Sequence, residues 1–171
     1  MDEIVNRVAK SPLITLDFEE FYPEGKRQEL DISQWLYEGL ILKEKEFRTA
    51  LTKHNWEQYK GTYVTLNCSS DAILPAWAML LVASYLEPVT KLVSVGSLQD
   101  LELVIFTKLV SELDVDYLKN KPVIIKGCSN KQIPEAAFVL LTQKIQKVAK
   151  LLMFGEACST VPIYKKSKRL N

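Results

Sequence analysis

Short strand-like runs, most of them rich in β-branched residues, alternate with longer apolar segments of helical spacing from residue 62 onward. The runs predict strands at 62–67, 90–95, 123–126 and 150–154. The segments between them predict helices at about 74–86, 97–112 and 134–148. This alternation is typical of βαβ units, which form parallel sheets with right-handed crossovers. We therefore predict an α/β fold with a mostly parallel sheet.

The pattern before residue 60 is less regular. Residues 13–18 alternate partly, as a strand does, and residues 30–32 are a short strand or an extended link. A helix is predicted to begin near Gln34, with Asp31 or Ser33 as its N-cap and Gly39 as a candidate break.

These patterns predict one domain over residues 1–171. It contains an N-terminal strand-plus-helix elaboration at 12–60, a repeated βαβ core at 62–160 and a basic tail at 165–171. The helix at 74–86 is apolar nearly all round, which predicts that the core or a second copy of the chain covers it. We expect a homodimer contact there.

An internal repeat links the three cysteines. The strand at 62–67 ends at Cys68, the strand at 123–126 is followed by Cys128, and Cys158 follows the strand at 150–154. Serine comes directly after each cysteine. The repeat suggests two similar βαβ halves in one sheet, in the strand order 2-1-3-4, with the first strands of the halves side by side. Ligands bind such sheets at the carboxyl ends of the strands, where the order reverses. Cys68 and Cys128 would line that crevice, and Cys158 could join them.

Composition excludes several classes of function. The chain has 171 residues, 47% hydrophobic and 25% charged, with a formal net charge of +1, so it carries no field that would favour nucleic acid or an acidic membrane. The longest uncharged run, at 72–86, is too short for a membrane span, and the N-terminus has no signal-peptide pattern. Three widely spaced cysteines fit a reducing compartment, so we expect a cytoplasmic protein.

Three interpretations of the cysteines stay open. Thiolates at strand ends, beside helix N-termini, suit zinc or an iron–sulfur cluster, although no Cys-x-x-Cys motif is present. The fourth ligand would be Asp71, His54 or Glu156, or a water or a partner protein's residue in their place, while carboxylates at Asp17 and at Glu19-Glu20 could also contribute. Alternatively, the cysteines are buried core residues. The third interpretation, a thiol enzyme, has only His54 as a base.

Four segments of the chain resemble a known family. They are Asp31 to Leu40, Cys68 to Ala72, Lys126 to Ser129 and Gly155 to Pro162. The chain resembles the bacterial family called domain of unknown function 2480, found chiefly in Bacteroidetes, from about residue 12 to residue 166. The family has no established activity, so the resemblance implies no catalytic residues. It does imply a link to iron–sulfur (SUF) cluster assembly proteins as partners.

The leading hypothesis is therefore a cytoplasmic accessory protein that binds zinc, iron or an iron–sulfur cluster through Cys68, Cys128 and Cys158. The alternative is a non-enzymatic interaction or scaffold domain with structural cysteines. The third is a thiol-dependent enzyme.

Overall fold

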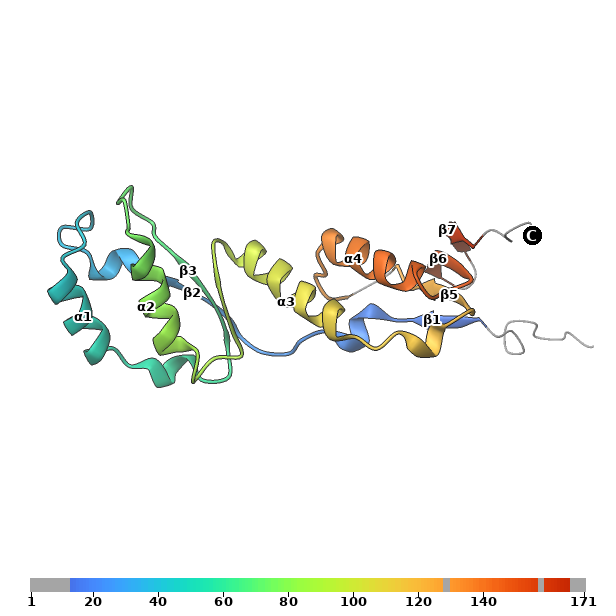
Figure 1. Cartoon of the computed structure of the whole chain (residues 1–171), viewed down its shortest axis with the longest axis horizontal. Coiled ribbons are helices and arrows are strands. Elements are labelled where there is room, and N and C mark those ends of the chain that lie inside the picture. The colour runs from blue at the N-terminus through green and yellow to red at the C-terminus, as the bar shows by residue number, and fades with distance from the viewer. Residues whose placement is uncertain (1–12, 128–129, 157–158, 167–171) are drawn as a thin grey trace, which may run out of the picture. The chain divides into compact units, whose positions relative to one another are not determined.

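The computed structural model describes residues 13–127, 130–156 and 159–166 and shows a mixed α/β chain with two mostly parallel sheets (Figure 1). Its α-helices in this part of the chain are α1 (Glu44–Lys53), α2 (Ala76–Leu86), α3 (Leu98–Glu112) and α4 (Glu135–Gln146). Its strands are β1 (Ile14–Leu16), β2 (Arg27–Asp31), β3 (Tyr63–Asn67), β4 (Leu92–Val95), β5 (Pro122–Ile125), β6 (Leu151–Glu156) and β7 (Ser159–Lys165). Short 3₁₀ helices are η1 (Phe18–Phe21), η2 (Ile32–Trp35), η3 (Trp56–Tyr59) and η4 (Asp116–Leu118).

The chain divides into two compact units. Residues 24–105 form one of them, which we call the inserted unit. The residues up to 23 and from 106 onward form the other, the terminal unit. The prediction that both belong to one domain stays a prediction.

The inserted unit is built on a parallel sheet in the order β2-β3-β4. Leu30 of β2 pairs with Leu66 of β3, and Leu66 pairs with Val95 of β4. Helices α1 and α2 supply buried side chains to the core of this unit. Its fully buried members include Ile32, Phe47, Leu51, Val64, Leu66, Ala78, Val82 and Leu86.

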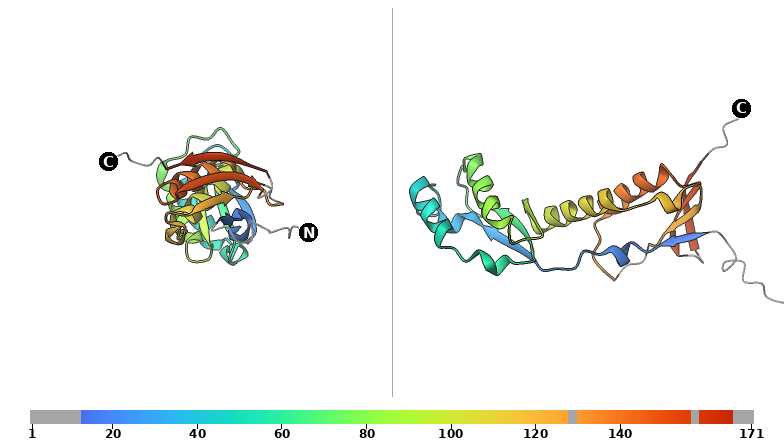
Figure 2. Two further views of the ribbon diagram at one scale, coloured as in Figure 1. Left: turned by 90° about the vertical axis from the view of Figure 1, so that its right-hand side faces the viewer. Right: turned by 60° about the horizontal axis from the view of Figure 1, so that its bottom comes forward.

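The terminal unit holds the four-stranded sheet β1-β5-β6-β7. The first three strands are parallel, and β7 runs antiparallel to β6, as the left view of Figure 2 shows in red. The end of α3 and the inner face of α4 pack in the core of this unit. Its buried members include Leu16, Phe18, Phe106, Val110, Val123, Ile125, Leu141, Ile145 and Leu152.

The predicted strand order 2-1-3-4 is wrong. The first strands of the two βαβ halves, β3 and β5, lie in different sheets. Each pairs with an earlier strand instead, β3 with β2 and β5 with β1. The repeat in the sequence corresponds to the strands and helices of each half. The sheet to which each half belongs depends on its pairing with β1 or β2.

The prediction of a helix that begins near Gln34 is also wrong. Only the short helix η2 forms there, and the α-helix starts ten residues later, at Glu44. Glu38 and Gly39 have positive φ angles of 50° and 71°, which a right-handed helix does not allow. Asp31, one of the two predicted caps, is the N-cap of η2 instead, because its side chain accepts a hydrogen bond from the backbone N–H of Ser33.

Candidate functional site at the strand ends

An ion pair joins the carboxyl ends of β1 and β5 in the terminal unit. The Nζ atom of Lys126 lies 2.6 Å from Oδ2 of Asp17, the residue after β1. The hydrogen bond and the negative charge of Asp17 raise the pKa of Lys126, and the charges of Glu156 and Glu19 act in the same direction. Lysine and carboxylates therefore gather where these parallel strands end.

Residues of η1 and its flanks also fasten the segment that follows β5. Oε2 of Glu19 accepts a hydrogen bond of 3.0 Å from the backbone N–H of Asn130. The Nζ atom of Lys131 lies 4.9 Å from the centroid of the Tyr22 ring, a cation–π distance. Contacts from the β1–η1 segment thus hold the chain on both sides of residues 128–129.

Glu156, the last residue of β6, carries the most unusual group in this region. Its Oε1 atom is buried and, within the described residues, has no hydrogen-bond partner. Burying a carboxylate oxygen without a donor is costly, so such atoms are uncommon unless they bind a ligand. Glu156 pairs in register with Ser159 of β7.

Glycines allow the close approaches around Glu156. Gly155 has a φ of +125°, and a Cβ there would lie 2.5 Å from the carbonyl oxygen of Ser159. A Cβ on Gly127 would lie 2.9 Å from the ring of Phe154. A side chain at either position would disturb the end of β6 or its neighbour.

The strand ends of the inserted unit show a different arrangement around Asp31. Its Oδ2 atom accepts hydrogen bonds from the hydroxyls of Ser33, at 2.7 Å, and Ser69, at 2.5 Å. Its Oδ1 atom accepts from the backbone N–H groups of the same two serines. Partial burial would raise the pKa of Asp31, but the hydrogen bonds from Ser69 and Ser33 outweigh it and lower that pKa from 3.8 to about 2.

Cys68 lies beside this network and is half-buried. Its Sγ atom is 3.3 Å from the hydroxyl oxygen of Ser70 and 3.6 Å from the carbonyl oxygen of the same residue. Asp71 is exposed to solvent. Both residues of this Cys-Ser pair therefore take part in hydrogen bonds: the thiol of Cys68 contacts Ser70, while Ser69 donates to Asp31.

His54 lies among aromatic rings. Its ring centroid is 4.7 Å from that of Trp56 and 5.1 Å from that of Trp35. Its Nε2 atom is 3.2 Å from the hydroxyl of Tyr59 and 3.1 Å from Nε2 of Gln58. Burial lowers the pKa of His54 below its usual 6.5, which favours the neutral ring.

The predicted site residues are thus distributed over both units. Cys68, Asp71 and His54 belong to the inserted unit and Glu156 to the terminal unit, while Cys128 and Cys158 lie outside the described residues. In the described part of the chain, no three His, Cys, Asp or Glu side chains are grouped as metal ligands would be. The three-cysteine site stays a prediction.

Sequence reasoning did not single out Lys126, although a signal for it exists. Lys126 follows the β-branched strand β5 directly, just as Asp17 follows β1. Once these strands are known to be neighbours, their opposite charges indicate an ion pair.

Comparison with known proteins identifies one family. The family described as "Protein of unknown function (DUF2480)" matches residues 2–166. No curated protein and no solved structure matches the chain. Among the helices in the described residues, none combines the length and the apolar character that crossing a membrane requires.

Proposed function

Because the chain belongs to the DUF2480 family of proteins of unknown function, which implies no reaction, we propose a function from the strand ends of the terminal unit. The protein is an accessory protein that binds zinc or iron there, with Glu156, Cys128 and Cys158 as ligands. The observation that carries this proposal is the buried Oε1 atom of Glu156, which has no partner among the described residues.

The donor set suits a soft or borderline metal ion. Two thiolates and a carboxylate are ligands that zinc and iron accept, and a fourth position would remain for water or a partner's residue. In the sequence, Cys128 follows Gly127, which comes two residues after the end of β5, and Cys158 precedes Ser159, the first residue of β7. Gly127 follows β5, and Glu156 is the last residue of β6, which pairs with β5 in parallel. This supports a site at the carboxyl ends of these two strands.

Cys68, Asp71 and His54 have no part in this narrower proposal. The thiol of Cys68 contacts Ser70, Asp71 is exposed, and His54 is held by Tyr59 and Gln58. Iron–sulfur assembly proteins as partners, and a cytoplasmic location, are parts of the proposal that rest on the family resemblance and the cysteine usage.

Metal and sulfide content of anaerobically purified protein tests the proposal. We expect about one zinc or iron per chain in the wild type, lost in Cys128→Ser and bound at least roughly 10-fold more weakly in Glu156→Gln, since the loss of an outer-shell partner alone typically costs about 10- to 100-fold. Cys68→Ser is the matched control and should retain the metal. Metal-free wild-type protein would refute the proposal, and equal loss in Cys68→Ser would refute its restriction to one unit.

A second candidate, a non-enzymatic interaction module that forms a homodimer, is favoured by the surface of α2. Leu80 on this helix is 70% exposed, and Ile73 just before it is 97% exposed. Large aliphatic side chains at such exposure mark association surfaces when they gather. Light scattering at micromolar concentration should give a dimer mass that Leu80→Asp reduces to a monomer. A monomeric wild type would exclude this candidate.

A further inference from the structure

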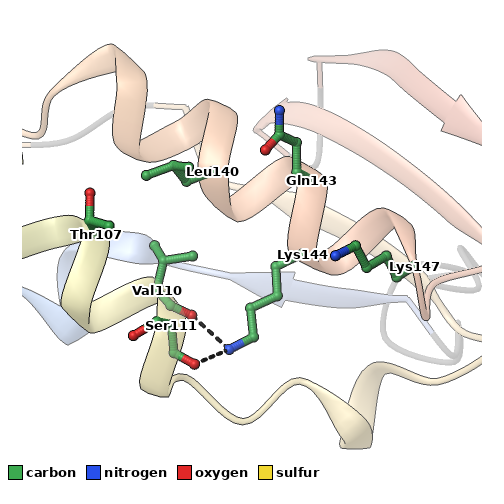
Figure 3. A pocket seen from close by; sticks show the side chains of 7 residues that line it. All are labelled: Thr107, Val110, Ser111, Leu140, Gln143, Lys144 and Lys147. Carbon is green, nitrogen blue, oxygen red and sulfur yellow. Dashed lines mark hydrogen bonds between the residues drawn. The ribbon is translucent and has the colours of Figure 1, made fainter.

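A groove runs between the end of α3 and the end of α4 in the terminal unit (Figure 3). Its volume is about 350 Å³, close to the lower limit for small-molecule sites. The residues that line it are Thr107, Val110 and Ser111 of α3 and Leu140, Gln143, Lys144 and Lys147 of α4 and its C-cap.

The wall of the groove combines an apolar surface with a fixed positive charge. Val110 and Leu140 belong to the hydrophobic core of the unit or pack against it. The Nζ atom of Lys144 donates hydrogen bonds of 2.7 Å to the carbonyl oxygens of both Val110 and Ser111, drawn as dashed lines in Figure 3. These carbonyls lie in the last turn of α3, so Lys144 caps that helix.

The charges around the groove favour an anion. Among the described residues, the lining contains two lysines and no carboxylate. Each helix C-terminus contributes roughly half a negative charge, which the two ammonium groups exceed. The charge of Lys144 largely compensates the partial negative charge at the C-terminus of α3. Lys147, exposed at the C-cap of α4, is therefore the cation available to a ligand. The hollow beside α1 differs, because Glu46 lies among its lysines.

We propose that the groove binds a small amphipathic anion, a carboxylate with a short aliphatic or aromatic body. The body would lie on Val110 and Leu140 and the carboxylate beside Lys147. This site is separate from the proposed metal ligands, and it does not depend on them.

Titration of ¹⁵N-labelled full-length protein with hexanoate tests the inference. We expect shifts of backbone amide signals confined to residues 107–111 and 140–147, saturating at millimolar concentration. Hexylammonium has the same body and the opposite charge, and should cause no saturable shifts there. Equal binding of the two probes, or hexanoate shifts centred elsewhere in the chain, would overturn the proposal.

A pair of lysine variants isolates the charge. Lys147→Gln should weaken hexanoate binding roughly fivefold, as expected for the loss of one exposed charge contact. Lys108→Gln is the control, since Lys108 is also exposed on α3 but pairs with Glu112 and does not line the groove. Equal hexanoate affinity in the two variants would also overturn the proposal.

Discussion

Asp17 and Asp31 hold similar positions, at the carboxyl end of the first strand of their sheets, and each is the cap of a 3₁₀ helix. Their charges are compensated in different ways. Asp17 faces the ammonium group of Lys126, whereas Asp31 accepts four hydrogen bonds from Ser33 and Ser69. A carboxylate that is held by neutral donors fixes the ends of β2 and β3 without adding a positive charge.

Ser69→Ala should therefore destabilise the inserted unit by about 1 kcal/mol at neutral pH, because it removes a hydroxyl donor to a charged, partly exposed group. Since the pKa of Asp31 is about 2 in the folded protein and 3.8 in the unfolded chain, its stabilising effect is complete above pH 3.8 and is lost as the pH falls toward 2. Urea unfolding from pH 7 to pH 2.5 should show the difference from wild type shrinking at low pH.

The control for this comparison is Ser84→Ala, in which an exposed hydroxyl that donates only to the carbonyl of Leu81 is lost. Its effect should stay below about 0.5 kcal/mol at every pH. A difference for Ser69→Ala that is the same at pH 7 and pH 2.5 would contradict the assigned role of Asp31.

His54 is the only histidine, so it provides a pH dependence that can be assigned. Burial lowers its pKa in the folded protein, so stability is complete above the unfolded pKa of 6.5 and declines as the pH falls through the folded pKa. In His54→Gln, the slope of unfolding free energy against pH just below 6.5 should largely disappear. An unchanged slope would show that other groups cause it.

For single residues, the role of a side chain was easier to predict from the sequence than the residues that it contacts. It offered Asp31 as one of two candidate caps, and the structure shows Asp31 as the N-cap of η2. The Asp31–Ser69 contact joins residues 38 positions apart, so it depends on which strands pair. No local pattern contains that information.

Among the elements, α4 shows how a helix of mixed composition is oriented. Its buried residues Ala137, Leu141 and Ile145 recur every four positions, whereas Val139 between them is 56% exposed. Leu141→Ala should lower the unfolding free energy by about 2–5 kcal/mol, because it leaves a cavity in the core of the terminal unit.

Val139→Ala is the matched aliphatic control for Leu141→Ala and should change stability by less than about 0.5 kcal/mol. Chemical denaturation followed by far-UV circular dichroism measures both variants. Similar losses in the two would mean that α4 presents a different face to the sheet.

The helices and strands after residue 62 were largely predictable, because each is a continuous segment with its own period. The predicted helix at 97–112 and the observed α3 differ by one residue at the start. Strand β7 was missed, since Pro162 and the basic residues after it obscure its alternation. The register shift near Pro162 shows how the sheet accommodates that residue at its edge.

At the scale of the whole molecule, the inserted unit is one continuous segment with its own core. A fragment of residues 24–105 should therefore fold alone. All three tryptophans of the chain, Trp35, Trp56 and Trp77, lie in this fragment, so their fluorescence reports its unfolding. A cooperative transition in urea is the expected result, and a fragment without one would show that the unit needs the rest of the chain.

The strand order could not be predicted from the sequence, because it depends on which strands pair, and the paired strands are far apart in the chain. Leu16 pairs with Ile125, and Leu30 with Leu66, yet the sequences before and after these strands do not specify the choice. The early strands were assigned to an elaboration, whereas they complete both sheets.

The pairing of β1 with β5 has a consequence for synthesis on the ribosome. Asp17 leaves the exit tunnel long before Lys126, its partner 109 positions later, has been translated. The whole inserted unit leaves the tunnel before Lys126 does and has all of its own strands, so it is free to fold cotranslationally. Strand β1 must wait unpaired until β5 appears, and its length of only three residues limits the edge that it offers to other nascent chains.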